Sequence, residues 1–217
     1  MTLVIVIIVA TVVLVLRAIR RQCMSPKIHC MLRCTCGKIQ GTVTAIRQDS
    51  IRINCYCQDC RDYATFVASL GNHPETTIGM PCGDSRVVQV CKSAVHIHKG
   101  REHLRLARKG RPDSKSKKKG QIYMHRYYAG CCHVPLMNTV DFLGFVGIFR
   151  DFLDDEQRHF AGPVSMFVEE ALESPQKPVD ISVMDFLWKL IRYYPWRKRG
   201  PFDYDLEPVY WGRDKEE

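Results

Sequence analysis

The feature that most constrains this sequence is the crowding of its cysteines into short groups. The stretch NCYCQDC places three cysteines within six positions, and two further groups read CTCG and CCH. In chain order these cysteines are Cys34 and Cys36, then Cys55, Cys57 and Cys60, then Cys131 and Cys132. Each group stands at an expected strand end or turn, where a chain can direct several sulfur atoms at one point. Such thiols can be small buried side chains, disulfide partners or metal ligands.

An apolar run near the N-terminus helps to choose among these roles. Residues 2–16 contain no charged side chain, and a helix of that length rises about 22 Å, short of a hydrocarbon core of roughly 30 Å. Including Ala18 and Ile19, with Arg17 extended to the lipid surface, lengthens the run to roughly 27 Å, enough for a thin membrane. A cleaved signal peptide and a buried strand are the alternatives. We predict that residues 1–21 form a single-pass N-terminal membrane anchor helix.

The basic residues around this run lie after it, at Arg17, Arg20, Arg21 and Lys27. By the positive-inside rule, the body of the protein is therefore predicted to face the cytosol. Disulfides are rare in that reducing compartment, and the 11 cysteines of the chain are an odd number. The clustered thiols are thus predicted to be metal ligands.

The remainder of the chain divides into two parts of different character. Short runs rich in Val, Ile, Thr and Tyr, separated by glycine-containing turns, predict a mostly β domain over residues 28–140. Within it we expect strands in 32–46, in 50–56 and in 121–128, and a hairpin over 87–107. Apolar periodicity predicts a helical C-terminal extension over residues 141–217. Its expected helices lie in 141–156, 162–174 and 180–194.

Charge is spread unevenly along the chain, whose net charge is +9. Residues 1–130 carry 22 Lys and Arg against 7 Asp and Glu, whereas residues 131–217 carry 10 against 16. Much of the basic excess lies in 99–119, which ends in SKSKKKG and is predicted to be a flexible, solvated basic loop. His96 and His98 share one face of an expected strand and fit a solvated face better than a metal site. The sequence has no phosphate-binding glycine loop and no Ser-His-Asp pattern, which argues against NTPases, kinases and serine hydrolases.

The spacing of the cysteines predicts two zinc sites of different kinds. Zinc takes about four ligands in a tetrahedron. Cys34 and Cys36 supply two sulfur atoms from a turn, and a later pair from a distant strand would close that site. The second group supplies three sulfur atoms, and the sequence offers no obvious fourth donor for it. Three protein ligands with one open position are typical of a reactive zinc site, where water or substrate takes the fourth place.

The order of these motifs resembles the GFA family. The resemblance covers roughly residues 30–140 and rests on CxCG, on CxCxxC after a strand, and on the late turn RYYAGCCHVPL. The namesake of the family is the glutathione-dependent formaldehyde-activating enzyme, and centromere protein V belongs to the same group. The resemblance implies an Mss4-like zinc-binding β-fold. It implies nothing about the predicted anchor or the C-terminal extension.

The resemblance also implies roles for the cysteines. Cys34 and Cys36 correspond to half of a structural zinc site that the late turn completes. Cys55, Cys57 and Cys60 correspond to the ligands of a second, catalytic zinc, which in the family handles adducts of glutathione-type thiols with formaldehyde.

The late turn departs from the family pattern Cys-x-x-Cys-Gly. Ala129 stands at the first cysteine and His133 at the glycine, while Cys132 matches the second cysteine. Neighbouring residues of a strand point to opposite faces, so Cys131 and Cys132 can bind one metal only if the chain turns there, which Gly130 favours. Cys131 is our predicted fourth ligand, and His133 is the alternative.

Two functions from different classes follow. The first is a zinc-dependent carbon–sulfur lyase acting on thiol adducts of small aldehydes, whose anionic substrate, such as glutathione, the basic half would attract. The alternative is a non-catalytic, membrane-tethered zinc module that binds anionic lipid, nucleic acid or an acidic partner through its basic loop, Lys115–Lys119 above all.

The predicted anchor can be tested by deletion. Removal of residues 1–21 should release a soluble, folded protein, whereas the full chain should sediment with membranes and resist extraction by salt. Fractionation of both forms, with circular dichroism of the truncated one, is the measurement. A full-length chain in the soluble fraction would show that the apolar run is not an anchor.

Overall fold

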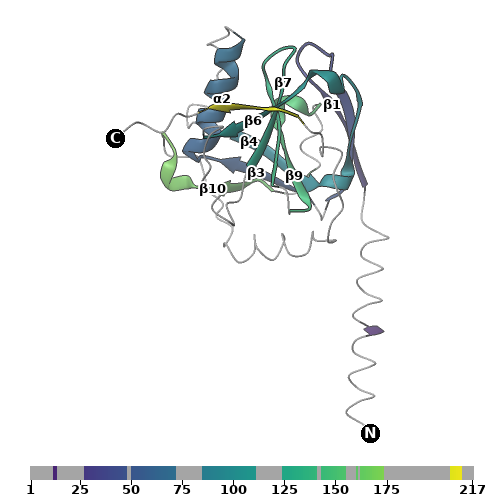
Figure 1. The fold of residues 1–217 in the computed structure, drawn as a ribbon. Helices are drawn as coiled ribbons and strands as arrows, with labels where there is room; N and C mark the ends of the chain where they lie inside the picture. The colour runs from purple at the N-terminus through teal and green to yellow at the C-terminus, as the bar shows by residue number, and fades with distance from the viewer. Residues whose placement is uncertain are drawn as a thin grey trace.

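The computed structural model describes the following parts of the chain: residues 12–13, 27–47, 50–71, 85–110, 124–140, 143–154, 160, 162–173 and 206–211. The described part is mostly β, with two sheets and one long helix (Figure 1). The predicted β-fold is confirmed at this level. No helix in the described part of the chain has both the length and the apolar character that a membrane crossing requires.

The smaller sheet has three antiparallel strands in the order β1-β2-β5. Their bounds are Lys27–Arg33 for β1, Gln40–Ile46 for β2 and Val95–Lys99 for β5. Along β1 exposed and buried residues alternate without a break, because one face of the sheet meets solvent and the other meets the core. His96 and His98 lie on the exposed face of β5, as predicted.

The larger sheet has eight strands in the order β10-β3-β4-β9-β8-β7-β6-β11. The six inner strands pair antiparallel, while β10 and β11 add to the two edges in parallel. The bounds in chain order are β3 Ile51–Cys55, β4 Ser85–Cys91, β6 Leu104–Lys109, β7 Met124–Ala129, β8 Pro135–Val140, β9 Phe145–Phe149, β10 Val164–Met166 and β11 Pro208–Trp211. Four 3₁₀ turns accompany them: Lys92–Ala94, Arg101–His103, Arg150–Phe152 and Val168–Glu170.

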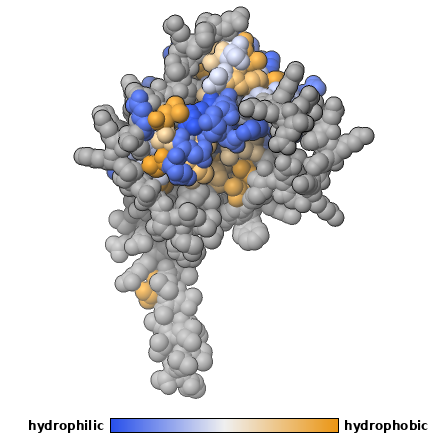
Figure 2. Space-filling view, turned by 90° about the vertical axis from the view of Figure 1, so that its left-hand side faces the viewer, coloured by the Kyte–Doolittle hydropathy of each residue, from blue (hydrophilic) through white to orange (hydrophobic). Residues whose placement is uncertain are grey.

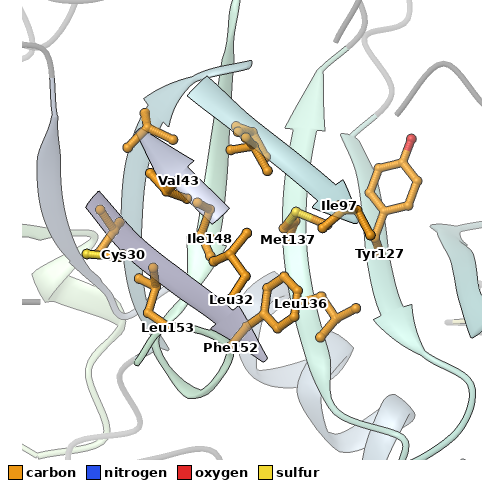
Figure 3. Packing of buried hydrophobic residues seen from close by; sticks show 14 of the residues in the cluster. Cys30, Leu32, Val43, Ile97, Tyr127, Leu136, Met137, Ile148, Phe152 and Leu153 are labelled. Carbon is orange, nitrogen blue, oxygen red and sulfur yellow. The ribbon is translucent and has the colours of Figure 1, made fainter. Parts of the chain in front are cut away.

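The main core lies between the two sheets. Leu32 of β1 and Val43 of β2 face Met137 and Ile148 of the larger sheet, and Phe152 closes the layer beside them (Figure 3). All five of these side chains are fully buried. The small sheet therefore serves as a cover for one face of the large sheet.

The other face of the large sheet is covered by helix α2, Gln58–Leu70. Tyr63 and Val67 of the helix pack against Phe149 of β9 and Trp211 of β11. Because successive strand residues point to opposite faces, Ile148 belongs to the main core while its neighbour Phe149 belongs to the helix side.

Two sequence predictions are wrong within the described residues. Residues 87–107 do not form one hairpin, because β5 pairs in the small sheet while β4 and β6 lie apart in the large one. The segments 141–156 and 162–174 are not helical where they are described, since they contain β9 and β10 with short 3₁₀ turns. Strand β9 is buried on both faces, and such a continuous apolar run cannot be distinguished from a buried helix by periodicity. The large sheet thus includes strands on both sides of residue 140.

Other predictions fall outside the described residues. These are the anchor over residues 1–21, apart from Val12 and Val13, the helix in 180–194, and Lys115–Lys119. The part of the predicted basic loop that is described, up to residue 110, contains strand β6 and is therefore partly ordered.

The core between the sheets can be tested with two leucines. Leu32 is fully buried, whereas Leu172 is 67% exposed. We expect Leu32→Ala to lower the free energy of unfolding by about 2–5 kcal/mol, because it removes apolar contacts and leaves a cavity. Leu172→Ala should change it by less than about 0.5 kcal/mol. Urea denaturation of both variants is the measurement, and equal losses would contradict this packing.

Candidate metal centres

The first candidate centre is built from two turns that belong to different sheets. Cys34 and Cys36 lie in the turn that joins β1 to β2. The turn is closed by a hydrogen bond of 2.8 Å from the Gly37 N–H to the Cys34 carbonyl oxygen, and Gly37 has a φ of 73°, which suits glycine. The Ile39 N–H donates to Cys34 Sγ at 3.2 Å and fixes the direction of that thiol.

Cys131 and Cys132 lie in the turn between β7 and β8 of the large sheet. The His133 N–H donates to the Ala129 carbonyl oxygen at 2.8 Å. Both cysteines thereby lie within one tight turn, as a shared site requires. The residue of this turn in the left-handed conformation is His133, with a φ of 50°.

The four thiols of these turns form what we call the four-cysteine group: Cys34, Cys36, Cys131 and Cys132. Their Sγ atoms all lie within 4.8 Å of one another, and His133 is not a member. Four Sγ–Sγ separations are 3.3 Å for Cys36–Cys131, 3.5 Å for Cys34–Cys36, 3.9 Å for Cys34–Cys131 and 4.0 Å for Cys131–Cys132. A tetrahedral ion with metal–sulfur bonds of about 2.3 Å needs sulfur atoms about 3.8 Å apart. The four-cysteine group therefore fits a metal ion.

The thiols of this group differ in proton affinity. A hydrogen bond from the Lys38 N–H lowers the pKa of Cys36 to about 7, and Cys36 is exposed. Burial raises the pKa values of Cys34 and Cys131.

The second candidate centre, the three-cysteine group, consists of Cys55, Cys57 and Cys60. Cys55 is the last residue of β3, Cys57 is the N-cap of α2, and Cys60 lies in the first turn of the helix. The Cys60 N–H donates to the Cys57 carbonyl oxygen at 3.1 Å, and the Cys55 and Cys57 Sγ atoms are 3.3 Å apart. All three Sγ atoms lie within 4.8 Å, and among the described residues no fourth metal-binding side chain joins them.

The three thiols are not equally accessible. Cys55 and Cys60 are buried, whereas Cys57 is partly exposed. A cation held by the three sulfur atoms would therefore be reached by solvent from the side of Cys57. That arrangement differs from the four-cysteine group, in which protein sulfur supplies all four corners.

The position at a helix N-terminus favours thiolates, because the first N–H groups of a helix carry partial positive charge. Hydrogen bonds from the Cys55 and Cys60 thiols lower the pKa of Cys57 to about 2. The Cys55 thiol, which donates to Cys57, has its pKa raised to about 11, and the pKa of Cys60 is raised as well. Cys57 is thus the first of the three thiols to lose its proton.

The segment that follows β10 lies beside this helix end. The Tyr56 N–H donates to the Met166 carbonyl oxygen at 3.0 Å, and the Gln58 N–H donates to Glu170 Oε2 at 2.7 Å. Glu170 therefore supplies the side-chain cap that Cys57 does not. Figure 2 shows the face on this side of the molecule, where hydrophilic residues gather with hydrophobic ones around them.

Arg126 is a further residue of this region that the cysteine motifs did not reveal. Its side chain is 4% exposed, and its Nη1 donates to the carbonyl oxygen of Asp59, which lies between Cys57 and Cys60 in the helix. The positive charge of Arg126 adds to the lowering of the Cys57 pKa and opposes the rise in the pKa of Cys60. The available sequence signal is an arginine inside the strand-like run at 121–128, and it does not show that this side chain is buried.

The remaining described cysteines do not join either group. Cys30 is buried in the main core and Cys91 is partly exposed at the end of β4. Cys30 is thus a small buried side chain of the core.

The fold and the two cysteine groups define a mostly β protein that could hold two metal ions. The chain belongs to a family of unknown function, DUF6151, whose sequence profile matches residues 25–166. The matched range includes both cysteine groups and ends at the last residue of β10. A comparison with curated proteins gives no match.

The membership of the four-cysteine group can be tested in the late turn. We expect Cys131→Ser and Cys132→Ser each to remove one tightly bound metal ion per chain, because each takes one sulfur from the group. His133→Asn should retain the metal, since it removes the imidazole while Asn tolerates the left-handed conformation. Metal content by elemental analysis after dialysis is the measurement. Loss of metal in His133→Asn would make His133 a ligand.

Proposed function

We propose that this chain is a GFA-like zinc protein with one structural and one reactive zinc site. The proposal is supported by the division of seven cysteines into a group of four donors and a group of three. Tetrahedral sites built from thiolates are typical of zinc and of iron, and zinc has no redox chemistry that would oxidise its own thiolates. The order of the motifs, described above, supports the kinship with the GFA family.

Under this proposal the four-cysteine group holds the structural zinc. Its four thiols come from the β1–β2 turn of the small sheet and the β7–β8 turn of the large sheet. A metal there would link the two sheets that enclose the main core. Structural zinc contributes directly to folding free energy, so the small sheet would depend on it.

The three-cysteine group would hold the reactive zinc, with Cys55, Cys57 and Cys60 as ligands. Bound there, zinc supplies a Lewis acid with an open position. The chain's own contribution is to favour the deprotonated form of Cys57 at the α2 N-terminus and to leave the side of Cys57 open to solvent.

The reaction we propose is that of a carbon–sulfur lyase acting on thiol adducts of small aldehydes. In an S-hydroxymethyl thiol of the glutathione type, the carbon–sulfur bond breaks and the electron pair leaves with sulfur. The hydroxyl oxygen loses its proton and forms the carbonyl group of the aldehyde, and the departing sulfur takes up a proton from solvent to give the thiol. The products are a thiol and an aldehyde, so no oxidant or reductant is needed.

One observation favours the alternative, a non-catalytic zinc module. The carboxylates around the N-terminus of α2 are already engaged: Asp59 contacts Lys109, Asp62 accepts from Gln58 Nε2, and Glu170 accepts from the Gln58 N–H. None of these three carboxylates is therefore free to act as a general base. In this alternative the chain is tethered to the membrane through residues 1–21, faces the cytosol, and binds an anionic partner at Lys115–Lys119.

A Cys57→Ser variant tests whether the protein has the reactive zinc site or is a non-catalytic module. If the three-cysteine group holds a reactive zinc, this change should reduce the bound zinc from about two to about one per chain and abolish thiol-adduct cleavage. The fold should persist, because the four-cysteine group still links the sheets. Zinc analysis, thermal melting and release of formaldehyde from S-hydroxymethylglutathione are the measurements, with Cys91→Ser as the matched control. Unchanged zinc content in Cys57→Ser would show that these thiols are not ligands.

A further inference from the structure

Arg126 occupies an unusual place for a cation. Its guanidinium lies at the first turn of α2, where it donates to the Asp59 carbonyl oxygen, with Nη2 4.0 Å from Asp59 Oδ2. The N-terminus of a helix carries partial positive charge and disfavours a cation. A buried arginine there needs a source of negative charge that outweighs this repulsion.

Asp59 does not supply that charge fully. Its side chain is 51% exposed, and it is shared with the Lys109 ammonium. The aromatic neighbours of Arg126 hold its guanidinium in place, because Cζ lies 5.2 Å from the Tyr63 ring centroid and 5.3 Å from that of Trp211. Tyr63 itself is fully buried and donates to the Tyr127 carbonyl oxygen at 2.9 Å. The arginine is therefore fixed beside the three-cysteine group, and its contacts with the other described residues do not fully neutralise its positive charge.

A three-cysteine group with a bound divalent metal ion would carry the negative charge that Arg126 lacks. Three thiolates bring three negative charges, and a divalent cation returns two positive ones. One net negative charge then remains in a group of which two thiols are buried. A neutral pair forms if one buried cation stands beside it.

We propose that Arg126 is a positioning residue of the three-cysteine group that offsets the net negative charge of its metal-loaded form and so raises its metal affinity. The inference rests on the proposed metal binding by this group. It assigns no ligand role to Arg126 and no role in the four-cysteine group. It also gives a reason for the parallel strand β11 at the sheet edge, since Trp211 of that strand forms one wall around the guanidinium.

The test uses the full chain loaded with two ¹¹³Cd²⁺ ions, so that each site has its own resonance and can be followed during competition with a chelator. Arg126→Gln should weaken binding at the three-cysteine group by about 10- to 100-fold, the usual effect of losing a group that supports metal ligands. Arg126→Lys, which keeps the charge, should recover most of the affinity. The resonance of the four-cysteine group should be unaffected in both.

Arg108→Gln is the matched control, because Arg108 is a partly buried arginine of β6 that contacts His125 and not the helix end. It should leave both affinities within about twofold. Equal losses at both sites in Arg126→Gln, or unchanged affinity at the three-cysteine group, would overturn the proposal. A wild-type chain with a single cadmium resonance would instead contradict the proposed second metal site.

A second variant, which is expected to raise the metal affinity, keeps the proposal testable if Arg126→Gln does not fold. Asp59→Asn removes a half-exposed carboxylate that competes for the arginine and keeps a side chain of the same size. We expect cadmium to bind the three-cysteine group about two- to fivefold more tightly in this variant, the scale of a partly exposed charge interaction. Unchanged or weaker binding would contradict the role of charge.

Discussion

The junction of the two sheets is the constraint on which the rest of this structure depends. The small sheet covers the large one through the main core, and beyond that core the four-cysteine group joins the β1–β2 turn to the β7–β8 turn. The three strands of the cover pair only with one another, and no strand of the small sheet pairs with a strand of the large one in the described part of the chain. Cross-linking both turns through one ion would fix the two sheets relative to each other at the point where they meet. With a metal ion bound, the four-cysteine group would therefore act as a structural element of the fold, as the proposed function holds.

The opposite face of the large sheet has a different organisation. There helix α2 covers the described strands, and its N-terminus brings together Cys55, Cys57 and Cys60. The N-terminus of a helix favours anions. The partial exposure of Cys57 leaves one side of the three-cysteine group open to solvent. Under the proposed function, a closed group on one face and an open group on the other would let separate thiols serve stability and reactivity. A substitution in one cysteine group would then leave the other group undisturbed, so its effect could be assigned to one group.

The edges of the large sheet connect the later part of the chain to this open group. Strand β10 and the turn after it cap the helix through Glu170, and strand β11 brings Trp211 against Arg126. Both strands pair in parallel with partners far away in the sequence. The region that the sequence assigned to a helical extension thus includes strands that surround the candidate site. A central, doubly covered strand such as Phe145–Phe149 has no alternation to reveal it, which is why its apolar run was misinterpreted.

The sequence by itself determined the spacing of the thiols and the mostly β character of the domain, because ligand spacing and turn residues are local properties of the chain. It also limited the late turn to Cys131, Cys132 or His133 as candidates. Tertiary structure decided what depends on distant segments: that both cysteines of this turn join Cys34 and Cys36, and that Arg126 lies beside the other thiols. It also decided that the strands at 145–149, 164–166 and 208–211 complete the large sheet. Strand pairing and the burial of a charge arise from contacts between residues far apart in the chain, and local periodicity carries no information about them.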